Sequence, residues 1–220
     1  RGRLGQNFDS IKLGGIDLDK EINRVLLVGC GTAYHAALLG KYYMENIANM
    51  PASVEFAHEN KYKSNPTEEG TLVIAVSQSG ETIDTLGAIQ EALKKGLDTM
   101  AITNTVSSSV AREVTEGIYQ RIGPEISVAS TKAFTSQSVI LLMLAIALGS
   151  KRHLSTLRVK KYISEIRKLP ALIEETLLLE DDMRGLAKKY TMSKEFNFLG
   201  RQYTYPIALE GALKLKELSY

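Results

Sequence analysis

Residues 71–82 read TLVIAVSQSGET, an apolar run that gives way abruptly to small polar residues. The first half, Thr71–Val76, is apolar after its threonine, as expected of a strand that is buried on both faces of a sheet. Strands of this kind belong to parallel sheets that are covered by helices on both sides. The second half, Ser77–Thr82, lies where the strand is followed by a helix, and such sheets bind their ligands at that edge.

Similar short apolar runs lie before and after this stretch, separated by longer segments with helical periodicity. The regular alternation predicts an α/β fold, a three-layer, doubly wound sandwich around a five-stranded parallel sheet. The predicted strands are Arg24–Gly29, Ala52–Ala57, Thr71–Val76, Thr99–Thr103 and Gly117–Ile122. The predicted helices are Ala33–Asn49, Ile83–Lys95, Ser108–Val114 and Thr131–Leu148.

The pattern changes after residue 150, which predicts three parts: a first lobe over 1–150, a helical connector over 151–194 and the start of a second lobe over 195–220. Lys151–Lys189 has helical periodicity, with Pro170 as its one internal breaker. Phe196–Gly200 reads as a new strand and Tyr205–Leu218 as a helix, a strand–glycine–helix unit like VLLVGCGTAYHAALLG at the opening of the first lobe. One such unit cannot bury its own apolar face, so we expect the chain to be a fragment of a longer protein.

Composition excludes several classes of protein. The net charge of +2 gives no reason to expect nucleic acid or an anionic membrane as a partner. The longest apolar run, Val139–Leu148, has about half the roughly 20 residues of a membrane span and predicts a buried helix. A single cysteine, Cys30, rules out an internal disulfide and suits the cytoplasm. The three histidines are scattered along the sequence, so no metal is expected.

Ser77, Gln78, Ser79 and Thr82 are the strongest candidates for binding a ligand. Three hydroxyls and an amide stand where a helix begins, and the first amides of that helix are free to bind an anion. The segment therefore predicts a phosphomonoester site. The alternative is an ordinary helix cap, which would need only one of these hydroxyls.

The end of the first strand, GCGTAY, matches the opening of a dinucleotide-binding motif, but Tyr34 stands where that motif has its third glycine. Nicotinamide binding is therefore not expected, and we predict no cofactor. Thr32 remains a candidate ligand at the same edge of the sheet. Ser130, in PEISVASTK, also follows a strand and should face the same crevice, although by itself the segment is an ordinary serine-rich helix start.

The last predicted helix carries Glu210, Lys214 and Glu217 on one face. By spacing alone this pattern is typical of an exposed, salt-bridged stripe. An acid–base pair tuned by the lysine is the alternative.

Four segments taken together, CGTAY, SQSGETIDT, PEISVASTKAFTSQ and ALEGALKLKELSY, resemble the isomerase domain of glutamine–fructose-6-phosphate aminotransferase (glucosamine-6-phosphate synthase). The resemblance spans nearly the whole chain. SQSGET alone is typical of the wider, flavodoxin-like sugar-isomerase (SIS) fold, whereas VASTKAFT with EGALKLKE is specific to the aminotransferases. The resemblance implies amination and isomerisation of fructose 6-phosphate to glucosamine 6-phosphate, with glutamine as the nitrogen donor.

The same resemblance implies a role for each matching residue. Ser77, Gln78, Ser79 and Thr82 would hold the substrate phosphate, Thr32 would contact the ligand, and Val128 and Ser130 would hold sugar hydroxyls. Glu217 would move a proton between C1 and C2, assisted by Lys214. Ala33 departs from the family, which has a serine there, so one hydroxyl to the phosphate is missing.

The resemblance also implies which partners the chain has and which catalytic residues it lacks. The family's ring-opening histidine and imine-forming lysine are expected beyond Tyr220, so this polypeptide alone is not expected to synthesise glucosamine 6-phosphate. A glutaminase domain and a second copy in a homodimer are the implied partners. Two alternatives stay open: a non-catalytic sugar-phosphate sensor, and an isomerase or deglycase for another phosphosugar.

Overall fold

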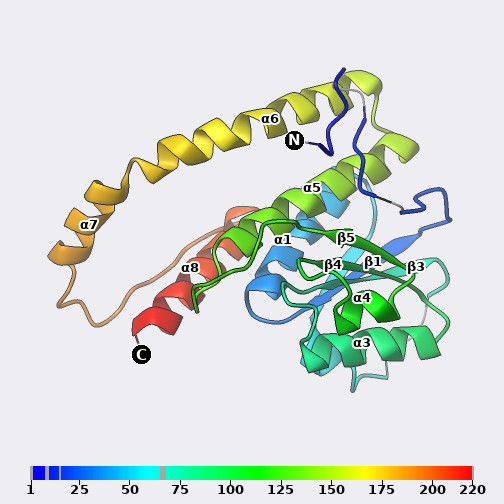
Figure 1. Cartoon of the computed structure of the whole chain (residues 1–220), viewed down its shortest axis with the longest axis horizontal. Helices are drawn as coiled ribbons and strands as arrows, with labels where there is room; N and C mark the ends of the chain where they lie inside the picture. The colour runs from blue at the N-terminus through cyan, green and yellow to red at the C-terminus, as the bar shows by residue number, and fades with distance from the viewer. Residues whose placement is uncertain (1, 8–9, 15, 65–67, 220) are drawn as a thin grey trace.

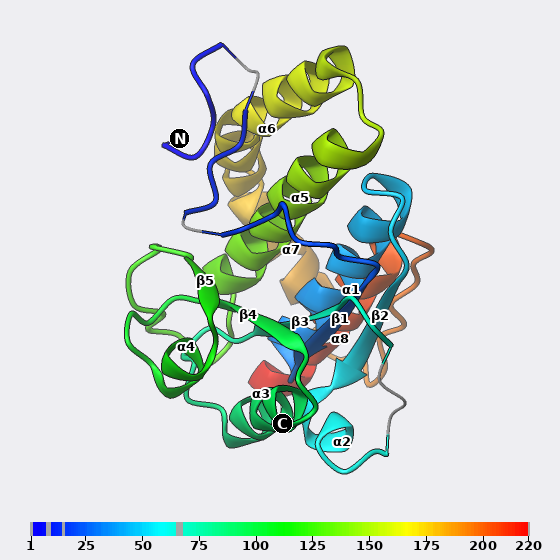
Figure 2. The ribbon, with the colours of Figure 1, turned by 90° about the vertical axis from the view of Figure 1, so that its right-hand side faces the viewer.

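The computed structural model describes residues 2–7, 10–14, 16–64 and 68–219. Figure 1 shows the whole chain. Five strands form one all-parallel sheet in the order β2-β1-β3-β4-β5, which the labels of Figure 2 follow across the view. The strands are β1 Arg24–Gly29, β2 Ala52–Phe56, β3 Thr71–Val76, β4 Asp98–Thr103 and β5 Glu116–Tyr119. The predicted α/β fold with a five-stranded parallel sheet is confirmed.

Helices cover both faces of the sheet, as Figure 2 shows. They are α1 Thr32–Asn46 and α5 Lys132–Arg152 on one face, and α2 Ala57–Asn60, α3 Ile83–Lys94 and α4 Ser109–Glu113 on the other. The buried strand β3 supplies both layers: Ile74 and Val76 pack under α1 and α5, whereas Val73 and Ala75 pack against α3. Because successive side chains of a strand point to opposite faces, an apolar run of this kind builds two cores.

The most apolar helix is α5, and it lies inside the fold. By length and composition α5 alone among the described helices could cross a membrane, yet 67% of its most apolar window is buried. It packs closely on α1, because Gly40 of α1 leaves room for Leu141: a Cβ at position 40 would lie 2.9 Å from a Leu141 methyl carbon. The predicted buried helix over Val139–Leu148 is confirmed.

The winding of the sheet reverses between β1 and β3. From β1 the chain passes to β2 on one side, then crosses over to β3, β4 and β5 on the other. The turns that leave β1 and β3 therefore diverge and open a crevice at the carboxyl ends of these two strands. Residues 30–32 and 77–82 follow those two strands.

Two predicted elements of the first lobe and the connector differ in detail. The strand predicted to reach Ile122 ends at Tyr119, because Arg121 has a φ of 56°, which takes the backbone out of the extended conformation. Pro170 does not break its helix, since α6 runs over Thr156–Leu177 with the proline inside it. The proline lacks an N–H to donate, so the helix continues with one hydrogen bond fewer.

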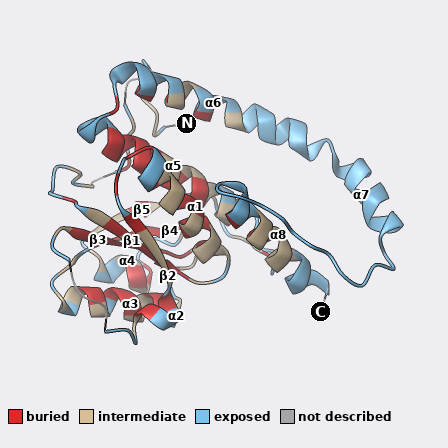
Figure 3. Cartoon of the chain, turned by 180° about the vertical axis from the view of Figure 1, so that it is seen from behind, coloured by how far each residue is buried: buried red, intermediate tan, exposed pale blue. Residues whose placement is uncertain are grey.

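Beyond Leu169, the last residue of α6 that packs against the core, the chain leaves the globule. Figure 3 shows the far half of α6 and α7 (Glu180–Lys189) exposed, before α8 (Thr204–Ser219) returns to lie beside α1. Tyr203 fixes this return, because its hydroxyl accepts a hydrogen bond of 3.0 Å from Asn46 and its ring stacks on Tyr43. The helix predicted over Tyr205–Leu218 is present.

The strand predicted at Phe196–Gly200 is wrong, because the structure has no strand there. An extended segment becomes a strand only when a neighbour pairs with its backbone, and no described strand lies beside this one. Its apolar side chains, Phe196, Phe198 and Leu199, are exposed.

Candidate functional site

A cavity of about 180 Å³ lies at the point where the winding of the sheet reverses. Six of the predicted ligand-binding residues line it: Thr32, Ser77, Gln78, Ser79, Thr82 and Ser130. They come from three turns, after β1, after β3 and before α5. The structure thus brings together residues that are up to 98 positions apart between Thr32 and Ser130.

A second hollow, of about 210 Å³, lies between the strands and the helices of the α3 face, near the start of β1. It is lined in part by Arg24, Glu68 and Thr71. These groups already pair with one another, since Arg24 bonds to the Glu68 carboxylate and the Thr71 hydroxyl donates to the Glu68 carbonyl. Parallel sheets bind ligands at the carboxyl edge, so the smaller cavity is the functional candidate.

Hydrogen bonds from its own backbone amides to its own side chains fix the conformation of the turn 77–82. The Ser77 hydroxyl accepts a hydrogen bond of 3.0 Å from the Gly80 amide, and the Ser79 hydroxyl accepts one of 3.1 Å from the Glu81 amide. Gly80 has a φ of 67°, which a residue with a side chain rarely adopts. This conformation lets the chain turn sharply into α3.

The helix-cap interpretation of this turn does not fit the structure. Thr82 is the N-cap of α3, yet its side chain makes no capping hydrogen bond. Its hydroxyl instead lies 3.4 Å from that of Ser77, on the wall of the cavity. The Thr82 hydroxyl, which a cap would consume, therefore remains on the cavity wall at the positive end of a helix dipole.

Residues before α5 form a second part of the wall. Ser130 donates a hydrogen bond of 3.0 Å to Glu125, whose carboxylate also accepts from the amides of Thr131 (3.2 Å) and Ala133 (3.1 Å). Burial raises the pKa of Glu125, but these amide and hydroxyl donors outweigh it and leave the pKa below its ordinary value. Val128 does not line the cavity, and its side chain is 91% exposed.

A cluster of polar side chains where α8 meets α1 adjoins the cavity at Thr32. Glu210 accepts hydrogen bonds from the Thr32 hydroxyl (2.8 Å) and His35 Nδ1 (2.7 Å). Lys214 donates to Thr32 Oγ1 (3.0 Å) and to Glu217 (2.5 Å). A continuous chain of hydrogen bonds thus joins Thr32 at the cavity to both carboxylates of α8.

The exposed-stripe interpretation of α8 is therefore wrong for Glu210, which is only 6% exposed. Lys214 is half-buried, and Glu217 at the end of the chain of bonds is exposed. Sequence reasoning missed the roles of His35 and Glu210. His35 lies one turn beyond Thr32 on α1, but nothing in the sequence links it to a carboxylate 175 residues away.

Burial by itself raises the pKa of Glu210, but the hydrogen bonds from His35 and Thr32 and the charge of Lys214 outweigh it, so the pKa lies below its ordinary value. A carboxylate with a depressed pKa stabilises the fold above its unfolded pKa of about 4.3, and that contribution is lost as the pH falls through the folded value. We therefore expect the parent chain to lose thermal stability on acidification below about pH 4.5 more steeply than Glu210→Gln.

Thermal denaturation over a pH series measures both slopes. The glutamine variant should be less stable than the parent at neutral pH, because His35 loses its anionic partner and Lys214 keeps only Glu217. Equal stability at neutral pH together with equal acid slopes would contradict the role given to Glu210.

Two buried residues that the sequence did not single out also line the cavity. Gln137 is 1% exposed, and neither Nε2 nor Oε1 of its amide has a hydrogen-bond partner among the described residues. The Thr85 hydroxyl is likewise buried and unpartnered. Buried polar groups in folded proteins are normally paired, so these two are candidates to meet a ligand. A glutamine two residues before the apolar run Val139–Leu148 of α5 was the available signal.

The chain resembles known proteins over its whole length. Residues 20–147 match the SIS domain family model. The glutamine–fructose-6-phosphate aminotransferase [isomerizing] of Methanosarcina mazei is 46% identical over all of this chain, and one from Thermus thermophilus is 42% identical. The chain spans about a third of these relatives, 36% of the length of each.

Solved structures agree. The C-terminal domain of the Francisella tularensis glucosamine-fructose-6-phosphate aminotransferase superposes with a TM-score of 0.90 at 38% identity, over 92% of this chain and 58% of that one. Glucosamine-6-phosphate deaminase from Thermotoga maritima superposes at 0.64 with 25% identity, over 89% of this chain and 58% of that one. With its parallel five-stranded sheet and its matching sequence, the chain belongs to the SIS domain family.

Proposed function

We propose that this chain is the sugar-phosphate-binding part of an isomerising glutamine–fructose-6-phosphate aminotransferase. The whole enzyme would convert fructose 6-phosphate and glutamine to glucosamine 6-phosphate and glutamate. The relatives that match every part of this chain carry that name, and the chain is similar to one segment of each. No cofactor enters the proposal.

One observation carries the proposal: the hydroxyls of Ser77, Ser79 and Thr82 and the amide of Gln78 converge on one cavity at the start of α3. We assign the substrate phosphate to these four side chains. The dipole of α3 and its free first amides favour a dianion there. Anchoring the phosphate places the reacting carbons at a fixed distance from it. The binding energy of the phosphate, which takes no part in the reaction, then serves to orient those carbons.

The sugar then extends from the phosphate toward Thr32 and α8. In the proposal Glu217 takes a proton from C1 and returns it to C2, or the reverse, through an enediol-like intermediate. Lys214 assists, since its ammonium group contacts both Thr32 and Glu217. Ser130 and the backbone of Val128 hold sugar hydroxyls.

Gln137 is a further ligand contact in this proposal. We expect Gln137→Leu to weaken binding of fructose 6-phosphate about ten-fold, the usual cost of one lost hydrogen bond to a ligand. The same change should leave the unfolding free energy equal or higher, because it removes a buried amide that has no partner in the free protein.

Calorimetric titration and chemical denaturation measure the two effects. Gln120→Leu is the matched control, since Gln120 is a buried glutamine that donates to the Ala133 carbonyl and does not line the cavity. That control should lose stability and keep its affinity. Parent-like affinity in Gln137→Leu would remove Gln137 from the site.

The organisation of the parent enzyme is also part of the proposal. We assign 1–150 to a first SIS lobe, 151–194 to a connector and 195–220 to the start of a second lobe. Apolar side chains that α6–α8 and the segment before α8 expose, such as Leu178 and Leu199, would be covered by the rest of that enzyme. A glutaminase domain, a homodimer and a cytoplasmic location complete the proposal.

Titration of the chain with fructose 6-phosphate tests the proposal, with fructose and inorganic phosphate as controls. Fructose 6-phosphate should bind with a saturable heat, fructose should show none, and inorganic phosphate should compete weakly. Arabinose 5-phosphate tests the alternative that the pocket serves another phosphosugar. Tighter binding of the pentose phosphate, or equal binding of fructose and its phosphate, would contradict the assignment.

A further inference from the structure

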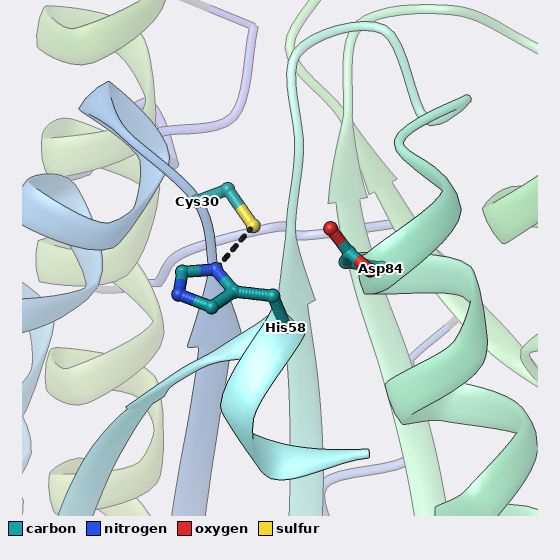
Figure 4. Close-up of side chains that lie close together, drawn as sticks. All are labelled: Cys30, His58 and Asp84. Carbon is teal, nitrogen blue, oxygen red and sulfur yellow. Dashed lines mark hydrogen bonds between the residues drawn. The ribbon is translucent and has the colours of Figure 1, made fainter. Parts of the chain in front are cut away.

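Cys30, His58 and Asp84 lie together beside the cavity, on three different turns of the carboxyl edge. Cys30 directly follows β1, His58 lies in α2 directly after β2, and Asp84 lies in the first turn of α3. One potential ligand atom from each lies within 4.8 Å of the other two, and Cys30 Sγ is 3.9 Å from His58 Nδ1. Figure 4 shows Asp84 across a small gap from the Cys30–His58 pair.

A thiolate, an imidazole and a carboxylate form a ligand set that zinc accepts. Zinc bonds of about 2.3 Å to sulfur and about 2.0 Å to nitrogen place these two atoms about 3.5 Å apart in a tetrahedral site. The observed 3.9 Å is already close to that value. Small side-chain rotations would bring all three atoms into range, with a fourth position left for water or another ligand.

Neighbouring groups orient two of the three ligands, Asp84 and His58, as outer-shell partners do in metal sites. Lys61 donates to Asp84 Oδ1 at 3.1 Å, which leaves the other carboxylate oxygen for an ion. His58 Nε2 lies 3.9 Å from the Glu59 carboxylate, so Nδ1 is the nitrogen that faces the thiol. The ring of His58 also stacks on Phe56 at 5.1 Å between centroids, which limits its orientation.

We propose that Cys30, His58 and Asp84 bind one zinc ion at the rim of the cavity. On binding, the thiol S–H bond breaks, the proton passes to solvent, and the sulfur electron pair coordinates the ion, so no oxidant or reductant is needed. Cys30 also lines the cavity, so the ion would lie next to bound ligand. The proposal does not depend on the identity of that ligand.

Titration of zinc against a chromophoric chelator tests the proposal on the chain as it stands. The parent should bind one zinc ion per chain, and Cys30→Ser, His58→Ala and Asp84→Asn should each lower the affinity about ten-fold or more. The matched control is His153→Ala, which removes a histidine at the far end of α5 and should keep the parent affinity. Circular dichroism checks that each variant is folded.

Cobalt gives an independent readout of the sulfur ligand. Cobalt added to the parent and to His153→Ala should produce a thiolate-to-metal charge-transfer band, and Cys30→Ser should lack it. Parent-like zinc affinity in folded Cys30→Ser and His58→Ala, or a cobalt spectrum without a thiolate band in the parent, would overturn the proposal. Neither result changes how the sugar-phosphate titrations are interpreted, because those titrations are done without added metal and test a different set of residues.

Discussion

Replacing Ser79 and Thr82 together by alanine is expected to weaken binding of fructose 6-phosphate at least about 100-fold. A hydrogen bond to a charged group contributes roughly 1.5–3 kcal/mol, and the variant removes two from the proposed phosphate site. Ser79 has a second role, because its hydroxyl accepts from the Glu81 amide and shapes the turn. Calorimetric titration of parent and variant gives the ratio of the two affinities.

Ser155→Ala is the matched control for this pair. Ser155 is the N-cap of α6, where its hydroxyl accepts from the Arg158 amide, far from the cavity. Losing that cap should cost about 1 kcal/mol of stability and leave the affinity unchanged. An affinity within about two-fold of the parent in the Ser79/Thr82 variant would show that the phosphate is bound elsewhere.

Gly80→Ala is expected to lower the unfolding free energy by about 3 kcal/mol and to abolish measurable ligand binding. Two costs add. The φ of 67° is strained for any residue with a Cβ, and that Cβ would lie 2.0 Å from the Ser108 hydroxyl. Ser108 is 1% exposed and is the N-cap of α4, and its Cβ would lie 2.6 Å from the added carbon, so rotating the hydroxyl away does not relieve the clash.

Two other glycines separate these costs. Gly96 has a φ of 71° but open space around its Cβ position, so Gly96→Ala should show the backbone cost alone, about 1 kcal/mol. Gly185 lies inside α7 with nothing within 4 Å, so alanine there should stabilise the helix by up to about 1 kcal/mol. Chemical denaturation measures all three. If Gly80→Ala cost no more than Gly96→Ala, the packing against Ser108 would not matter.

The sheet could be predicted from the sequence because its strands differ so sharply from what surrounds them. Thr71–Val76 and Arg24–Gly29 were predicted to the residue, since both are apolar runs bounded by polar or glycine residues. The errors occur where contacts with distant parts of the chain determine the secondary structure. Phe196–Gly200 has the composition of a strand but no neighbour to pair with, and Pro170 sits in a helix that tolerates one missing hydrogen bond.

The residues of the site likewise fall into those that could be predicted from the sequence and those that could not. Turns that follow parallel strands meet at one edge, so Thr32, the 77–82 segment and Ser130 could be placed together from sequence order alone. Glu210 could not, because its burial depends on α8 docking against His35 and Thr32. The same holds for His58, which is remote from Cys30 in sequence and adjacent to it in the fold.

A crystal structure of the chain soaked with fructose 6-phosphate would examine the core of this account most directly. We expect electron density for the phosphate within hydrogen-bonding distance of the Ser77, Ser79 and Thr82 hydroxyls, with the sugar carbons directed toward Thr32 and α8. A hexose phosphate lodged at another place on the molecule, with the turn after β3 vacant, would contradict it.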